Sequence, residues 1–357
     1  MSVPAGTGPV GPGDRPVGSL AVVRPGAHRV GMARRPPRIV LALAVALAIA
    51  APTQARDFPT RPTTPPTGTI SGTVTPGSPT VPGAPACGIF PASNVWNVRI
   101  DSRPKAGNSA TMLTSIGLDR GLHMDFGSYA GYGIPYQVVT ASTPRSTVVF
   151  DYDDESDHVG YPIPTSPKIE GGSDRHILMV DRDACRLYEL FNARKTTSGW
   201  KAGSGATWDL GSNALRPLGW TSADAAGLPI LPGLVRYDEV AAGIIRHALR
   251  FTTNVTRNKY LYPARHYASS STSTSLPPMG LRVRLKATFS TAGFSPQAKV
   301  IAIALKQYGM ILADNGSPWY ITGASDPHFD DDVMHELDVI TGRDLEVVDT
   351  TGLVNGP

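Results

Sequence analysis

The sequence predicts a mainly β fold, a β-sandwich of jelly-roll type with a few peripheral helices. Three observations favour this class. Short segments that alternate apolar and polar residues recur after residue 87. The 37 Gly and 33 Pro of the 357 residues separate these segments as turns and loops. Only two segments carry a helical apolar stripe of useful length. A β-barrel with inserted helices is the alternative architecture.

The expected strands are short runs rich in β-branched, aliphatic and aromatic residues. In order they are Ile134–Thr140, Ser146–Tyr152, Arg175–Asp181, Cys185–Asn192, Ile245–Thr253, Leu281–Phe289, Met310–Asp314 and Leu345–Asp349. Alternation in the sixth run predicts that Leu281, Val283 and Leu285 face a core, whereas Arg282 and Arg284 face solvent.

Two helices have sequence signals at their ends. Ser295 and Pro296 are typical of an N-cap followed by a first helical residue, and Gly309 is typical of a stop. Asp330–Ile340 begins with an acidic turn and is followed by Gly342. Short helical turns are expected at Ser109–Ile116, Ser222–Ala226 and Tyr237–Ala242.

Composition divides the chain into four segments. Residues 1–31 are expected to be a disordered extension, or sequence upstream of a true initiator at Met32. Residues 32–55 combine basic, apolar and small-residue zones in the order of a signal peptide, which predicts a mature start near Arg56. Residues 56–86 are a Pro/Thr-rich linker, and residues 87–357 form one globular domain.

Charge argues against nucleic acid as a partner. The net charge is +4, but residues 1–55 hold six Arg and one Asp, so the remainder carries 27 basic and 28 acidic residues. A nearly neutral body lacks the basic surface that phosphate binding needs. No membrane span is expected once the signal peptide is cleaved.

The two cysteines agree with export. Cys87 and Cys185 are the only cysteines of the chain, and two cysteines in an oxidising compartment usually pair. We therefore expect a disulfide and a secreted, extracellular protein, with association to the cell wall as a further option.

Several segments resemble an uncharacterised family of exported bacterial proteins. They are FPASNVWN (Phe90–Asn97), NALRPLGWTSADAAGLPILPGLVRYDEVAAG (Asn213–Gly243), RHALRF (Arg246–Phe251) and YGMILADNGSPWYI (Tyr308–Ile321). The resemblance covers most of the globular domain and implies export. It carries over no reaction, fold or catalytic residue.

Three ionisable residues share strand faces with apolar neighbours. Glu189, His176 and His247 occupy positions where alternation predicts burial. Because burial raises the pKa of a carboxyl, Glu189 is a candidate general acid or nucleophile with the two histidines as partners. Asp174 or Asp314 would supply a second carboxylate. The structural alternative is that the histidines bond core carbonyls and Glu189 pairs with an arginine.

Other residues indicate substrate binding. Arg246, Arg250 and Arg265 are candidates for holding a carboxylate or sulfate, or are solvated strand residues. His266, Trp208, Trp220, Asn315 and Trp319 lie in or beside polar loops, where an indole can stack on a sugar ring. The alternative is that most of the tryptophans fill the ends of the sandwich.

No cofactor is expected, and the sequence has no zinc motif. Acidic residues alternate at Asp151, Asp153, Glu155 and Asp157, as in some calcium loops, although the EF-hand glycine and final glutamate are missing. A structural calcium ion is one interpretation, and a solvated acidic loop is the other.

Together these features predict an exported carbohydrate-active enzyme, a glycoside hydrolase acting on an extracellular or cell-wall polysaccharide. One alternative is a polysaccharide lyase that uses a histidine and a tyrosine with an arginine. The other is a non-catalytic glycan- or wall-binding module, which needs only the aromatic residues.

Overall fold

The computed structural model of the protein describes residues 77–353. The expected extension, the signal peptide and residues 56–76 of the expected linker lie outside the described residues. Residues 77–86 were expected in the linker, but Val81 and Ala84 are buried in the hydrophobic core. Among the described helices, none is long and apolar enough to cross a membrane.

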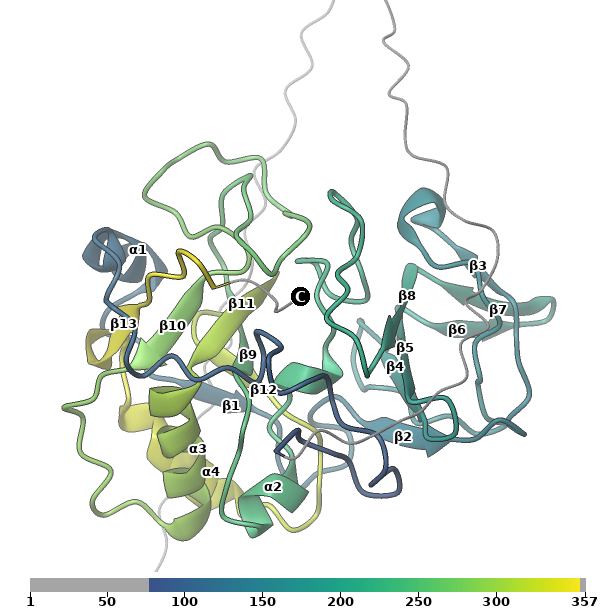
Figure 1. Ribbon diagram of the computed structural model, residues 1–357, viewed down its shortest axis with the longest axis horizontal. Helices are drawn as coiled ribbons and strands as arrows, with labels where there is room; N and C mark the ends of the chain where they lie inside the picture. Colours follow the sequence, from purple (N-terminus) through teal and green to yellow (C-terminus); the bar gives the residue numbers. More distant parts are fainter. Residues whose placement is uncertain (1–76, 354–357) are drawn as a thin grey trace, which may run out of the picture. The chain divides into compact units, whose positions relative to one another are not determined.

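The described chain is mainly β, as predicted, with three sheets and short helices (Figure 1). The six-stranded sheet has the order β1 (His123–Asp125), β12 (Tyr320–Thr322), β9 (Leu249–Thr253), β11 (Met310–Asn315), β10 (Arg282–Leu285) and β13 (Leu345–Val347). The four-stranded sheet has the order β2 (Tyr136–Val139), β4 (Ile177–Asp181), β5 (Arg186–Phe191) and β8 (Ser204–Asp209). The three-stranded sheet comprises β3 (Val148–Phe150), β7 (Gly199–Ala202) and β6 (Arg194–Thr196).

This topology does not confirm a jelly roll. A jelly roll is antiparallel, but β1 with β12, β9 with β11, β2 with β4, and β3 with β7 pair in parallel. The α-helices are α1 (Ser109–Ile116), α2 (Tyr237–Ala241), α3 (Pro296–Gln307) and α4 (Asp331–His335). The 3-10 helices are η1 (Asp153–Glu155), η2 (Leu231–Gly233), η3 (Glu336–Val339) and η4 (Gly342–Asp344).

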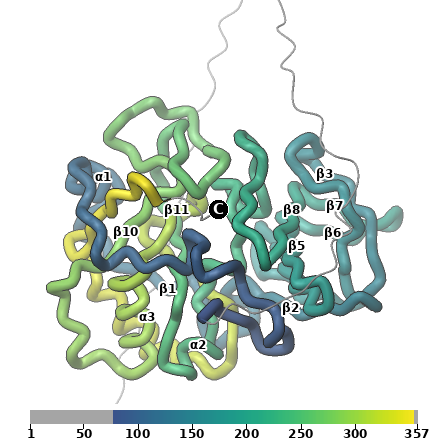
Figure 2. Tube along the Cα trace, viewed as in Figure 1, coloured from purple at the N-terminus to yellow at the C-terminus, as the bar shows by residue number. Residues whose placement is uncertain are grey.

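The four-stranded sheet is buried on both faces. Along β4, Leu178 and Val180 belong to the main core, whereas Ile177 and Met179 belong to a second apolar cluster shared with the three-stranded sheet. Every residue of β4 is therefore buried, as expected for a continuous apolar run covered on two sides. Figure 2 shows this part of the chain, in blue and teal, on one side of the six-stranded sheet.

Helix α3 begins at Pro296, as its sequence signals predict, and packs on β10. The helical turn expected at Ser222–Ala226 is wrong, because this segment is an irregular turn. The expectation that Arg282 and Arg284 of β10 face solvent is also wrong. Arg282 is buried and its Nε donates to the Tyr308 carbonyl, while Arg284 Nε donates to Glu346.

The predicted disulfide between Cys87 and Cys185 is present, with Cα atoms 5.2 Å apart. It ties the early part of the described chain to the turn before β5. The 98-residue separation makes this a long-range cross-link, which restricts the unfolded chain considerably.

Candidate functional site

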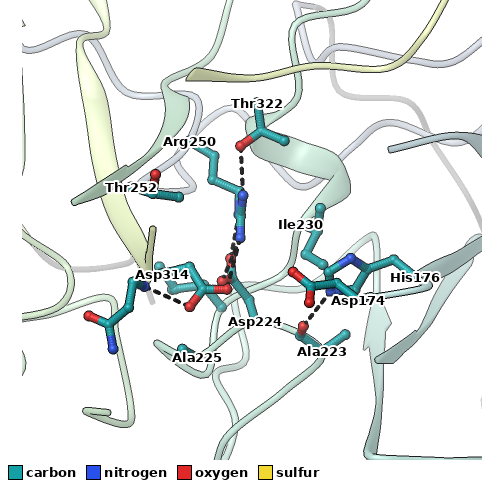
Figure 3. Close-up of polar contacts among 12 residues, drawn as sticks. Asp174, His176, Ala223, Asp224, Ala225, Ile230, Arg250, Thr252, Asp314 and Thr322 are labelled. Atoms are coloured by element: carbon teal, nitrogen blue, oxygen red, sulfur yellow. Dashed lines mark hydrogen bonds and ion pairs between the residues drawn. The ribbon is translucent and has the colours of Figure 1, made fainter. Parts of the chain in front are cut away.

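A buried arginine joins the six-stranded sheet to the loop that follows β8. Arg250 in β9 donates two hydrogen bonds to Asp224, from Nε to Oδ2 at 2.8 Å and from Nη2 to Oδ1 at 2.9 Å. Its Nη1 donates to the Thr322 hydroxyl in β12 at 2.6 Å, and Nη2 also contacts Asp314 Oδ2 in β11 at 3.3 Å (Figure 3). One guanidinium thus fixes two carboxylates, as its planar fork allows.

A β-bulge places Asp314 on the Arg250 face of the sheet. Leu312 pairs with Phe251, and Asp314 pairs with Thr252, so Ala313 is an extra residue in β11. In regular pairing Asp314 would lie opposite Thr253, on the apolar face that includes Phe251. The bulge turns the carboxyl away from that core and toward the arginine.

The carboxyl of Asp314 differs from that of Asp224 in exposure. The Asp224 side chain is fully buried, whereas 25% of the Asp314 side chain is exposed. Burial, with the nearby charge of Asp224, raises the pKa of Asp314 to about 7, although Arg250 and the Asn315 amide oppose the rise. Asp314 can therefore hold or release a proton near neutral pH, as a general acid requires.

Asp314 opens on a cavity of about 270 Å³. The lining combines carboxylates, hydroxyls and aromatic rings from several parts of the chain. They are Tyr152 and Glu155 at η1, Phe191 and Ser204 at β5 and β8, Thr221 to Ala225 in the following loop, His266 and Ala268 in the connection between β9 and β10, and Asp314 in β11. Such a mixture of apolar walls and a few converging polar groups is typical of a small-molecule site.

The floor of this cavity is held by a second charged pair. His176 is buried, and its Nδ1 lies 2.5 Å from Glu170 Oε2 while its Nε2 donates to the Ala223 carbonyl at 2.9 Å. Burial opposes a charge on His176, but the hydrogen bond and charge of Glu170 outweigh it and raise the histidine pKa. The pair therefore anchors the loop residue next to Asp224.

Glu189 is buried as predicted, but its partners are backbone amides rather than an arginine. The Ile230 amide donates to both carboxylate oxygens at 2.9 and 3.0 Å, and the Leu231 amide donates to Oε1 at 2.9 Å. Burial raises the Glu189 pKa to about 7, although these two amides oppose the rise. Glu189 thus binds the start of η2, and it is not among the residues lining the cavity.

The other predicted acid–base residues lie apart from the cavity lining. His247 is buried, with Nε2 2.9 Å from Glu239 and Nδ1 2.8 Å from the Ala248 carbonyl. Asp174 is exposed and accepts a hydrogen bond from Ser173. Of the predicted acid–base set, Asp314 alone is among the residues that line the cavity.

Some of the predicted binding residues lie at the cavity, and others lie outside it. His266 lines the cavity, and Asn315 lies next to Asp314. Arg246 is exposed outside the lining, and Arg265 Nε donates to the Arg216 carbonyl.

The predicted tryptophan platforms are mostly inside the protein. Trp208 and Trp319 are buried, and Trp319 Nε1 donates to the Gly117 carbonyl. Trp220 is half-buried, with the Arg216 guanidinium over its ring. Buried indoles have no free face for a sugar, so the structure agrees with the alternative that they fill the interior.

The acidic loop makes contacts within the protein. Glu155 Oε2 accepts from the Thr221 amide at 2.7 Å, and Asp157 Oδ2 accepts from Arg216 Nη1 at 2.9 Å. Across residues 77–353, no group of three or more His, Cys, Asp and Glu side chains is arranged to hold a metal ion. The calcium interpretation stays a prediction.

Sequence reasoning missed Asp224, Glu170 and Tyr152 as site residues. Asp224 lies in a turn between small residues, with no periodic pattern that could indicate its burial. Its position depends on Arg250, which is 26 residues away in the chain. Comparisons with protein-family models, curated proteins and solved structures found no match to this chain.

Proposed function

We propose that the protein is an exported carbohydrate-active enzyme that hydrolyses glycosidic bonds, and that the cavity beside Arg250 is its active site. The observation that carries the proposal is Asp314, a partly exposed carboxyl with a pKa of about 7 that opens on a cavity with a second carboxylate, Glu155. Two carboxyl groups with different environments are what glycoside hydrolysis requires.

Each residue has a role in this mechanism. Protonated Asp314 donates its proton to the oxygen of the departing sugar, and Arg250 with Asp224 holds it in place. Glu155, with one oxygen fixed by the Thr221 amide, either takes a proton from the water that attacks the anomeric carbon, or attacks that carbon itself to form a glycosyl-enzyme that water then hydrolyses. His266 lines the same cavity and supplies a hydrogen bond for a sugar hydroxyl, whereas the hydroxyls of Ser204 and Ser222 already donate to the Ser222 and Leu228 carbonyls.

The disulfide supports the exported, extracellular location, because such bonds persist in oxidising compartments. The size of the cavity supports a carbohydrate chain as substrate. Its volume of about 270 Å³ lies just below the range of typical small-molecule sites, roughly 300–1,000 Å³. It accommodates a short piece of a glycan, and the rest of a polysaccharide lies outside.

The test uses the purified full chain with a panel of plant, fungal and bacterial cell-wall polysaccharides, and it measures the release of reducing ends. Asp314→Asn should lower the rate by at least about a hundredfold, the scale of general acid catalysis. Asp332→Asn, a matched change at an exposed aspartate of α4, is the control. Hydrolysis that survives Asp314→Asn refutes the assignment, and glycan binding without hydrolysis by the wild type supports a non-catalytic module.

A polysaccharide lyase is the second candidate because His266 and Tyr152 line the same cavity. Lyases need a base, an acid and a cation for the uronate carboxylate. Among the described lining residues no lysine or arginine is present, which favours the hydrolase. An unsaturated uronate product, detected by its ultraviolet absorbance, would favour the lyase.

A further inference from the structure

Three aromatic rings form a row at the edge of the cavity, on the long connection between β9 and β10 that Figure 1 draws in green. The ring planes of His266 and Tyr267 differ by 7°, with centroids 5.9 Å apart. Those of Tyr267 and Tyr260 differ by 21°, with centroids 6.3 Å apart. Both pairs are stacked, and Tyr267, which is 44% exposed, is the member of this row, the 260–267 aromatic row, that offers most surface to solvent.

The row is continuous with the cavity. His266 and Ala268 both line it, and Tyr267 is the residue between them. The Ala268 carbonyl accepts from Asn315 Nδ2 at 2.8 Å, and Asn315 directly follows Asp314. His266, one end of the aromatic row, therefore lines the same cavity as the proposed acid, Asp314.

The segment carrying the row is fixed on two sides. The amides of Arg265 and His266 both donate to the Ala226 carbonyl, and the His266 ring Nδ1 lies 2.8 Å from the Ala225 carbonyl. On the other side, Asn315 holds Ala268 and also accepts from the Thr256 hydroxyl. Binding a ligand to a surface that is already ordered requires little further loss of conformational entropy.

We propose that the 260–267 aromatic row is an additional sugar-binding subsite, which holds the part of a glycan chain that extends beyond the cavity. The proposal rests on the proposed function for the identity of the ligand. A cavity of about 270 Å³ takes only a short piece of a polysaccharide. The next sugar rings must leave it over its edge, where a flat aromatic face can pack against the apolar face of a sugar. The row thereby selects oligosaccharides of several units over disaccharides.

The test compares disaccharides with hexasaccharides of the polysaccharide that the wild-type protein hydrolyses or, if it hydrolyses none, binds best. Calorimetry gives the Kd, and reducing-end release gives kcat/KM. We expect the wild type to prefer the hexasaccharide, and we expect Tyr267→Ala to reduce this preference about tenfold, equivalent to about 1.4 kcal/mol. Tyr267→Phe should retain most of the preference because it keeps the ring.

The matched control is Tyr129→Ala, since Tyr129 is 73% exposed and is not among the lining residues. The proposal is overturned if Tyr267→Ala and Tyr129→Ala leave the same preference, or if the wild type has none. The experiments at Asp314 and Tyr267 distinguish failure of the hydrolase proposal from failure of the subsite proposal. Length-dependent binding that needs Tyr267, without hydrolysis that needs Asp314, retains the subsite and rejects the enzyme. If hydrolysis needs Asp314 but Tyr267→Ala has no effect, the enzyme proposal is retained and the subsite is rejected. If the protein binds no carbohydrate, both proposals are rejected.

Discussion

Replacing Glu189 by glutamine tests whether this buried carboxyl anchors the fold. The group titrates near 7 in the folded protein, compared with 4.5 for an unperturbed glutamate. Between these two values the folded state binds more protons than the unfolded chain. Stability from this group is therefore complete below pH 4.5 and is lost as the pH rises through 7.

The size of the effect follows from the two pKa values. Between about pH 5 and about pH 8, the wild type should lose about 2–3 kcal/mol of unfolding free energy through Glu189 alone. Glutamine cannot ionise, and its carbonyl oxygen can still accept from the Ile230 and Leu231 amides, as Glu189 Oε1 does. The variant should therefore gain about 2–3 kcal/mol relative to the wild type over this range.

The assay is urea unfolding of both proteins at the two pH values, followed by circular dichroism. Taking the difference between the two proteins removes the titration of Asp314 and His176, which both retain. A difference that does not change with pH would refute the raised pKa of Glu189. A hundredfold loss of turnover without a loss of stability would make Glu189 the catalytic acid instead.

Three further predictions follow from the same contacts. Thiol titration of the denatured, unreduced protein should find no free thiol, and two free thiols would contradict the bond. Cys87→Ser with Cys185→Ser should lower the unfolding free energy by about 4.7 kcal/mol, measured in urea. Arg250→Met should cost about 3–5 kcal/mol because Asp224 is left buried without its partner, and an unchanged melting temperature would show that the pair is dispensable. Hydrolysis should fall as the pH rises above 7, where Asp314 loses its proton. In Arg250→Lys this fall in rate should occur at a higher pH, because the guanidinium lowers the Asp314 pKa and its shared contact is lost. An unchanged pH profile would show that Arg250 does not control the Asp314 pKa.

Local patterns predicted the elements whose signals lie within a few residues. The N-terminal proline of α3 and the continuous apolar run of β4 are examples, and both elements are present. Strand β8 was missed because Gly205 and its small neighbours have low strand propensity, and its pairing with β5 supplies the stability instead. Alternation along β10 predicts that Arg282 faces solvent, because it contains no information on the distant carbonyls of Tyr308 and Val95 to which the guanidinium donates.

The site was harder to predict for the same reason. Burial of Glu189, His176 and His247 was inferred correctly from their apolar neighbours on each strand. Their partners could not be inferred, because Ala223, Ile230 and Glu239 come from loops and from a short helix whose path depends on tertiary packing. Asp314 was selected from its loop and strand context, but its orientation depends on a bulge that has no signature in the sequence.

The extra residue in β11 has a consequence for how this protein can change during evolution. The Ala313 carbonyl accepts a hydrogen bond from the Ala226 amide at 2.9 Å, two residues from Asp224. Deleting one residue here would restore regular pairing with Asp314 still opposite Thr252, but it would remove the acceptor that positions the Asp224 turn. Substitution at position 313 keeps this backbone acceptor, but the buried side chain limits the choice to small residues. Homologues that keep this site should therefore retain both the length of the strand and a small residue at this position.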